Sequence, residues 1–98
     1  MYLSKYKIRG KKMQQEIRLK LINRLRDGHN IHMDESKFTS GARLEYDIGL
    51  DMFGRASFVN WVEREFNILV SKTAFVKIKT FGEIIQYVEH KRKQKYGR

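Results

Sequence analysis

The chain has 98 residues, of which 41% are hydrophobic and 12% aromatic, so it can build one modest core but not two. It has no cysteine and no proline, which excludes disulfides and thiolate metal sites and disfavours a turn-rich all-β fold. It contains no long apolar run, so the sequence predicts neither a membrane span nor a secretory signal, and we expect a cytoplasmic protein.

The formal charge of +10 is concentrated at the two ends of the chain. Residues 1–12 and residues 91–98 each carry five cations and no acid. All 11 acids lie in residues 13–90, where the remaining cations balance them. The sequence therefore predicts a basic N-terminal tail (1–12), a neutral domain (13–90) and a basic C-terminal tail (91–98).

The first predicted helix covers residues 13–27 and ends at Gly28. Its apolar residues recur at helical spacing: Ile17, Leu21, Ile22 and Leu25. Residues 29–50 are polar and irregular, and a connection of this length is usually functional or disordered. We expect an ordered loop that packs on the domain through scattered apolar side chains, namely Ile31, Met33, Phe38, Leu44, Tyr46, Ile48 and Leu50.

The second predicted helix follows the N-cap Asp51 and runs to Phe66, with Asn67 at its end. The side expected to be buried carries Phe53, Val59, Val62 and Phe66.

Two further helices are predicted after residue 70. Ser71 caps a short helix in the segment 73–78, and Thr80 with Glu83 forms a T-x-x-E capping box for the last helix. The buried stripe of that last helix is Phe81, Ile84, Ile85 and Val88. One apolar face per helix predicts an all-α bundle of three long helices and one short helix, with a long ordered loop after the first.

The segment YDIGLDMFGRASFVNWVEREFNILV (46–70) resembles the acyl carrier proteins. That family typically reads E-D-L-G-x-D-S-L-D-x-V-E-L-V-x-x-L-E-E-E-F-x-x-x-I here, and the match needs no gap. It continues into KIKTFGEIIQYV (77–88), which is similar to the family pattern K-I-x-T-V-x-x-x-x-x-Y-I. The resemblance covers about residues 13–90 and implies an acyl-carrier-like bundle.

One departure falls on the residue that carries the family's chemistry. The resemblance implies that a serine after Asp51 would hold a phosphopantetheine arm, but this position is Met52, whose thioether has no hydroxyl. The nearest downstream hydroxyl, on Ser57, lies roughly 140° away around an ideal helix. We therefore expect no phosphopantetheine cofactor, unless Met52 is not the native residue and the protein is a genuine acyl carrier.

Other chemistry has little support in the sequence. His29, His32, Asp34 and Glu35 cluster in the loop, but their spacing matches no strong metal motif, so no metal is expected. No phosphate-binding loop, G-x-S-x-G or H-E-x-x-H motif is present, so we predict no catalytic residue and no enzyme.

The first functional hypothesis is a non-catalytic module that binds a protein partner through the second helix. The expected contact residues are Met52, Arg55, Ala56, Asn60, Trp61 and Arg64. Met52 would offer an adaptable apolar contact.

The alternative hypothesis is binding of nucleic acid or an anionic surface through the basic ends. The expected contact residues are Lys5, Lys7, Arg9, Lys11, Lys12, Lys91, Arg92, Lys93 and Lys95. Tyr2, Tyr6 and Tyr96 lie among these cations and could stack on single strands.

Overall fold

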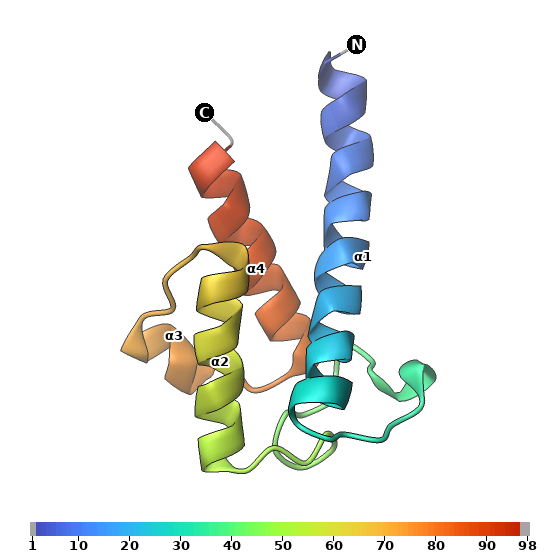
Figure 1. The fold of residues 1–98 in the computed structure, drawn as a ribbon. Coiled ribbons are helices and arrows are strands. Elements are labelled where there is room, and N and C mark those ends of the chain that lie inside the picture. The colour runs from blue at the N-terminus through green and yellow to red at the C-terminus, as the bar shows by residue number, and fades with distance from the viewer. Residues whose placement is uncertain (1, 97–98) are drawn as a thin grey trace.

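The computed structural model describes residues 2–96, which fold into four α-helices and one short 3-10 helix (Figure 1). The elements are α1 (Tyr2–Gly28), η1 (Glu35–Lys37), α2 (Met52–Phe66), α3 (Lys72–Lys77) and α4 (Phe81–Tyr96). The predicted all-α bundle of three long helices and one short helix is confirmed. Between residues 2 and 96, no helix combines the length and apolar character needed to cross a membrane.

The ends of α2 and α3 follow the predicted capping residues. The Asp51 carboxylate accepts a hydrogen bond of 2.6 Å from the backbone N–H of Gly54 at the start of α2. Asn67 ends that helix in the left-handed conformation, with φ 53°. The Ser71 hydroxyl accepts from the N–H of Ala74 at 3.1 Å and starts α3. These contacts satisfy backbone donors that a helix cannot satisfy internally.

The predicted capping box at the start of α4 is also present. The Thr80 hydroxyl accepts from the N–H of Glu83 at 3.1 Å, and the N–H of Thr80 donates to the Glu83 carboxylate at 2.9 Å. The N–H of Lys79 donates to the same carboxylate oxygen at 3.0 Å. These backbone donors, Lys79 first, hold the pKa of Glu83 below its ordinary value.

Helix α1 begins at Tyr2 rather than at the predicted residue 13. No proline interrupts residues 2–12, and a single glycine costs an exposed helix only about 1 kcal/mol relative to alanine. Helix α4 likewise continues past residue 90 to Tyr96. The predicted domain boundaries therefore fall inside helices, while residues 1, 97 and 98 of the predicted tails lie outside the described residues.

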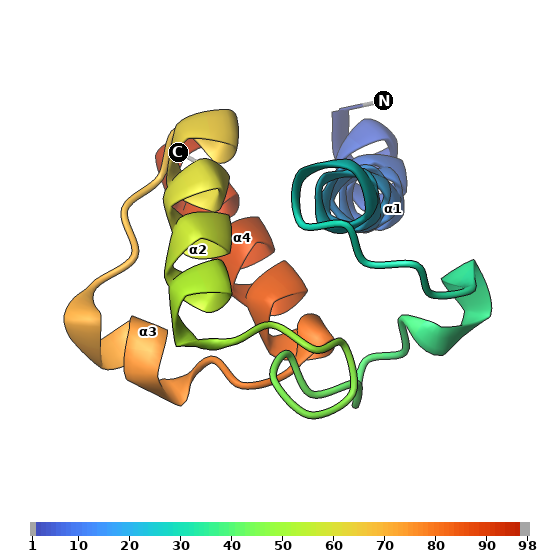
Figure 2. The same ribbon diagram turned by 60° about the horizontal axis from the view of Figure 1, so that its bottom comes forward.

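A single core lies between α1, α2, α4 and the loop that follows α1. Helices α1 and α4 pack side by side in opposite directions, and Gln14 Nε2 donates to Glu89 Oε1 at 2.9 Å across this pair (Figures 1 and 2). The fully buried side chains are Ile17, Leu21, Ile22, Leu25, Phe38, Leu44, Phe58, Val62, Phe81, Ile84 and Val88. Most of the predicted apolar stripes thus form one core.

The loop of residues 29–50 is ordered, as predicted, but one of its apolar side chains points to solvent. Phe38 and Leu44 are buried, whereas Tyr46 is 79% exposed. The Tyr46 ring lies beside the guanidinium of Arg43, 5.1 Å from the guanidinium carbon to the ring centroid. This surface contact replaces the burial that the hydrophobic pattern predicted.

Backbone hydrogen bonds join this loop to the start of α4. The N–H of Leu44 donates to the carbonyl oxygen of Lys79 at 2.9 Å, and the N–H of Phe81 donates to the carbonyl oxygen of Ala42 at 2.8 Å. Arginines of α1 bind the other half of the loop: Arg18 donates to the carbonyl oxygen of Phe38 at 2.6 Å. These bonds fix the loop on both sides.

Candidate functional site

Four of the predicted contact residues form one exposed row on α2. Met52, Ala56, Asn60 and Arg64 follow each other at four-residue steps, so each is turned by about 40° from the one before. All four are exposed, and the Met52 side chain is 77% exposed. The structure therefore brings these residues together on the solvent side of the helix.

The sequence pattern predicts that Phe53 of α2 is buried in the core, and this prediction is wrong. Phe53 is 84% exposed, next to Met52. The buried Phe58 lies five positions after Phe53, which places the two side chains about 140° apart around the helix. The angle between Phe53 and Phe58 around the helix is the sequence signal that indicates a solvent-exposed Phe53. We call Met52, Phe53, Ala56, Asn60 and Arg64 the α2 face.

Arg55 is not a surface residue, which corrects its assignment as a partner contact. Its guanidinium Nη2 donates to the carbonyl oxygens of Phe75 and Ile78, the latter at 2.8 Å. The guanidinium carbon also lies 4.6 Å from the centroid of the Phe75 ring, and Nη1 lies 3.4 Å from the Glu45 carboxylate. Arg55 is buried because α3 ends with carbonyl groups that need donors.

Trp61 lies at the edge of α2 that faces α1, away from the α2 face. Its ring is partly buried and stacks on Phe58, with 6.0 Å between centroids. The Arg24 guanidinium carbon of α1 lies 5.5 Å from the Trp61 centroid. The structure therefore uses Trp61 to join two helices, and it does not bring this residue to the predicted contact surface.

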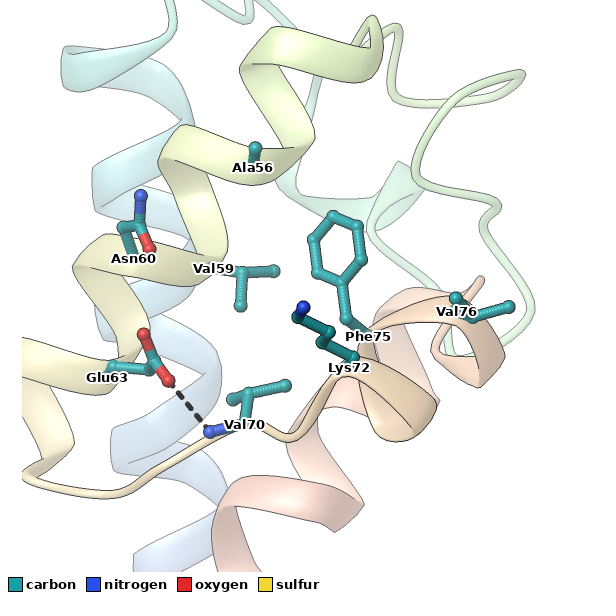
Figure 3. A pocket seen from close by; sticks show the side chains of 8 residues that line it. All are labelled: Ala56, Val59, Asn60, Glu63, Val70, Lys72, Phe75 and Val76. Atoms are coloured by element: carbon teal, nitrogen blue, oxygen red, sulfur yellow. Dashed lines mark hydrogen bonds between the residues drawn. The ribbon is translucent and has the colours of Figure 1, made fainter.

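A hollow of about 360 Å³ opens beside the α2 face, between α2 and the segment that leads into α3 (Figure 3). Its lining residues are Ala56, Val59, Asn60, Glu63, Val70, Lys72, Phe75 and Val76. The Glu63 carboxylate accepts a 2.8 Å hydrogen bond from the N–H of Val70 and holds the two sides together. Sequence spacing could not predict this hollow because its walls come from separate elements.

The start of α2 offers no oxygen for an ester bond at the position that the family resemblance singles out. Asp51 is engaged as the N-cap, and Met52 presents a thioether to solvent. Ser57 is exposed, but it lies five residues further along the helix. The side chain at position 52 therefore does not fit a covalently attached phosphopantetheine arm.

The histidine cluster of the loop does not assemble into a metal site among residues 2–96, where no three ligating side chains come together. His29 instead packs edge-on against Phe58, with 5.8 Å between ring centroids. Its Nε2 is buried without a hydrogen-bond partner. Burial, and then the charge of Arg24, lower the pKa of His29. His29 therefore acts as a neutral packing residue.

The cations predicted to bind nucleic acid lie on helices. Lys5, Lys7, Arg9, Lys11 and Lys12 belong to the first turns of α1, and Lys91, Arg92, Lys93 and Lys95 belong to the last turns of α4. Within α4, Lys93 lies 3.7 Å from the Glu89 carboxylate, and Lys91 lies over the Tyr87 ring.

Comparison with characterised proteins finds a relative that is an acyl carrier protein of Thermotoga maritima. The two chains are 37% identical over 59 residues, which is 60% of this chain and 73% of the relative. No model of a protein family matches the chain.

This comparison contradicts the prediction that the protein takes no cofactor. The relative is an acyl carrier protein, and such proteins normally carry a phosphopantetheine group. The Met52 side chain has no hydroxyl, so no phosphoester can form at position 52. This says nothing about attachment at other positions of the chain.

The structure and the comparison agree on the type of protein. The bundle has the helix order that the resemblance implies, and the matched residues cover nearly three-quarters of the relative. The chain belongs to the acyl carrier protein family.

Proposed function

We propose that this acyl-carrier-like domain is a non-catalytic binding module that docks a protein partner through the α2 face. The observation that carries the proposal is the pair of large apolar side chains at the start of α2. Phe53 is 84% exposed and Met52 is 77% exposed, and both lie in the first turn of a helix capped by Asp51. Aromatic side chains anchor many protein interfaces, and methionine adapts to partners of different shape.

The chemistry of the α2 face indicates what kind of partner would fit it. Its only charged member is Arg64, and Asn60 supplies an amide. A matching partner offers an apolar socket for Phe53, with a carboxylate at its rim for Arg64. A partner that binds a strongly acidic helix would not match the α2 face, because this face carries no acid.

The structure favours rigid docking. Arg55 anchors the buried side of α2 to α3, and Trp61 packs the edge against α1. The exposed side chains are therefore presented by a helix that is fixed on its other sides, so binding costs little ordering of the backbone. The proposed role is binding rather than catalysis, and a cytoplasmic location stays a prediction.

The test compares immobilised full-length protein with a variant that carries Met52→Gln and Phe53→Gln. Both are incubated with nuclease-treated lysate of the source cell at high salt, and retained proteins are quantified by mass spectrometry. We expect at least one protein to be retained by the wild type and lost from the variant, and its purified form to bind the wild type with at least about tenfold higher affinity, as loss of an anchor of about 2 kcal/mol implies.

Leu69→Gln is the matched control, because Leu69 is an 81% exposed apolar residue that lies outside the α2 face. This variant should retain the same protein as the wild type. Equal retention by the wild type and the double variant would refute docking through the α2 face.

A further inference from the structure

A second hollow, of about 380 Å³, opens between α1 and α2. Its lining includes Lys20, Arg24, Asp27 and Gly28 of α1 with Trp61 and Glu65 of α2. None of its lining residues belongs to the α2 face, so this site is separate from the proposed docking surface. Small-molecule sites have volumes of about 300–1,000 Å³, and the hollow falls within this range. We call it the α1–α2 hollow.

Two of the four charges that line the α1–α2 hollow are paired, and two are not. Lys20 Nζ lies 3.1 Å from the Glu65 carboxylate, and this ion pair joins α1 to α2. The Arg24 guanidinium forms no ion pair or hydrogen bond with any residue that the structure describes, and its Nε is buried without a partner. The Asp27 carboxylate, three residues further along α1, is likewise unpaired within the described part of the chain. The hollow therefore presents one unpaired cation and one unpaired anion.

Gly28 lets the Arg24 side chain lie along the last turn of α1. A Cβ atom at residue 28 would come within 2.7 Å of Arg24 Nε and within 2.8 Å of Arg24 Cδ. In this position the guanidinium carbon lies 5.5 Å from the centroid of the Trp61 ring. A contact with an aromatic ring uses none of the N–H donors of a guanidinium, so the terminal nitrogens stay available to an anion.

We propose that the α1–α2 hollow binds a free α-amino acid with an aromatic side chain. The α-carboxylate accepts hydrogen bonds from Arg24, the α-ammonium group binds the Asp27 carboxylate, and the ring packs against Trp61. Residues three apart on a helix have Cβ atoms about 5–6 Å apart, so Arg24 and Asp27 can reach two groups on one ligand carbon. Two cations and two acids line the hollow, and this balance suits a zwitterion better than a phosphate dianion.

The test uses the fluorescence of Trp61, the only tryptophan of the chain, as a direct report on the hollow. The full chain is titrated with L-phenylalanine, L-phenylalaninamide and N-acetyl-L-phenylalanine, with excitation of the indole alone. Each derivative lacks one of the two charges of the amino acid. We expect a saturable change in fluorescence with L-phenylalanine, and at least about tenfold weaker binding of both derivatives.

Three variants assign the contacts. Arg24→Gln should abolish the preference for L-phenylalanine over its amide, and Asp27→Asn should abolish the preference over the N-acetyl derivative. Asp27 is exposed, so its variant tests the site even if Arg24→Gln fails to fold. Gly28→Ala should weaken binding of L-phenylalanine at least about fivefold and leave the circular dichroism unchanged, because the added methyl group displaces only the mobile end of Arg24.

Lys37→Gln and Glu16→Gln are the matched controls, because each removes one exposed charge outside the hollow. Both should keep the wild-type preference for L-phenylalanine. The absence of a saturable change in Trp61 fluorescence would overturn the proposal. Equal affinity of the wild type for the amino acid and its two derivatives would also overturn it, as would preferences that persist in both Arg24→Gln and Asp27→Asn.

Discussion

Arg55 Nη2 donates a 2.8 Å hydrogen bond to the carbonyl oxygen of Ile78 and so ties α2 to the end of α3. The same nitrogen also donates to the carbonyl oxygen of Phe75, whose ring lies under the guanidinium. One cation thus satisfies two carbonyl groups that α3 leaves without helical partners. The wall of the hollow beside the α2 face depends on this contact.

Replacement of Arg55 by methionine should therefore destabilise the protein strongly. Methionine fills much of the space but leaves two carbonyl groups without a donor, so we expect the free energy of unfolding to fall by about 3 kcal/mol. Urea unfolding followed by circular dichroism measures the change. Arg64→Met, at an exposed position of the same helix, should change stability by less than about 0.5 kcal/mol. Similar losses in both variants would show that Arg55 has no special structural role.

Gly82 is required where α4 begins beside the loop. A Cβ atom at this position would lie 2.8 Å from the backbone oxygen of Ser40, which already accepts a hydrogen bond from the N–H of Gly82. Gly82→Ala should cost about 1–3 kcal/mol of stability, because the backbone must shift. Gly41→Ala meets no atom within 4 Å and serves as the control in the same unfolding assay. An unchanged midpoint for Gly82→Ala would contradict the close approach.

The imidazole of His29 should make stability depend on pH in the mildly acidic range. Burial, and then Arg24, lower the pKa of His29 in the folded protein below the ordinary value of 6.5. As the pH falls, His29 therefore takes up a proton at a higher pH in the unfolded chain than in the folded protein. Stability is fully present above pH 6.5 and decreases as the pH falls from there through the folded pKa. Urea midpoints measured from about pH 7.5 to about pH 5 test this trend.

His29→Gln should flatten the dependence of the urea midpoint on pH in that range, because it removes the imidazole whose pKa is lowered. The carboxylates contribute at lower pH. Backbone hydrogen bonds lower the pKa values of Asp47 and Glu83 below their ordinary values of 3.8 and 4.5, so their stabilisation is lost only as the pH falls below that range. A flat wild-type profile between about pH 7.5 and about pH 5 would contradict the assignment of His29.

A hydroxyl at position 52 should make the start of α2 a substrate for a phosphopantetheinyl transferase. Met52→Ser places an exposed hydroxyl directly after the N-cap Asp51, where the family resemblance puts the attachment serine. We expect peptide mass spectrometry to find the added group on residue 52 of this variant after incubation with coenzyme A and the transferase. Met52→Ala is the matched control and should leave the same peptide unmodified. Failure of Met52→Ser would show that the surrounding surface is not read by that enzyme.

Local rules predicted the helix ends well because the decisive contacts lie within a few residues. Asp51, Ser71 and Thr80 each bind a backbone N–H three residues ahead, and Asn67 ends α2 through its own backbone conformation. The order and type of the helices followed from these signals and from apolar spacing.

The candidate site was harder to predict because it depends on contacts between distant segments. The sequence around Arg55 gives no sign that its guanidinium is buried against the carbonyl oxygen of Ile78, 23 residues away. The apolar character of Phe53 suggests a core residue, although its angle around the helix points it to solvent. The apolar spacing of the first helix begins at Met13, so the sequence predicts a start there, whereas α1 begins at Tyr2.

The contacts of the loop also order events during synthesis of the chain. Residues 42 and 44 bind the backbone of residues 81 and 79, and Gln14 binds Glu89. Neither junction can form until residues 79–89 have left the ribosome. Nascent α1 and α2 must therefore hold their apolar faces without the partner that α4 later supplies.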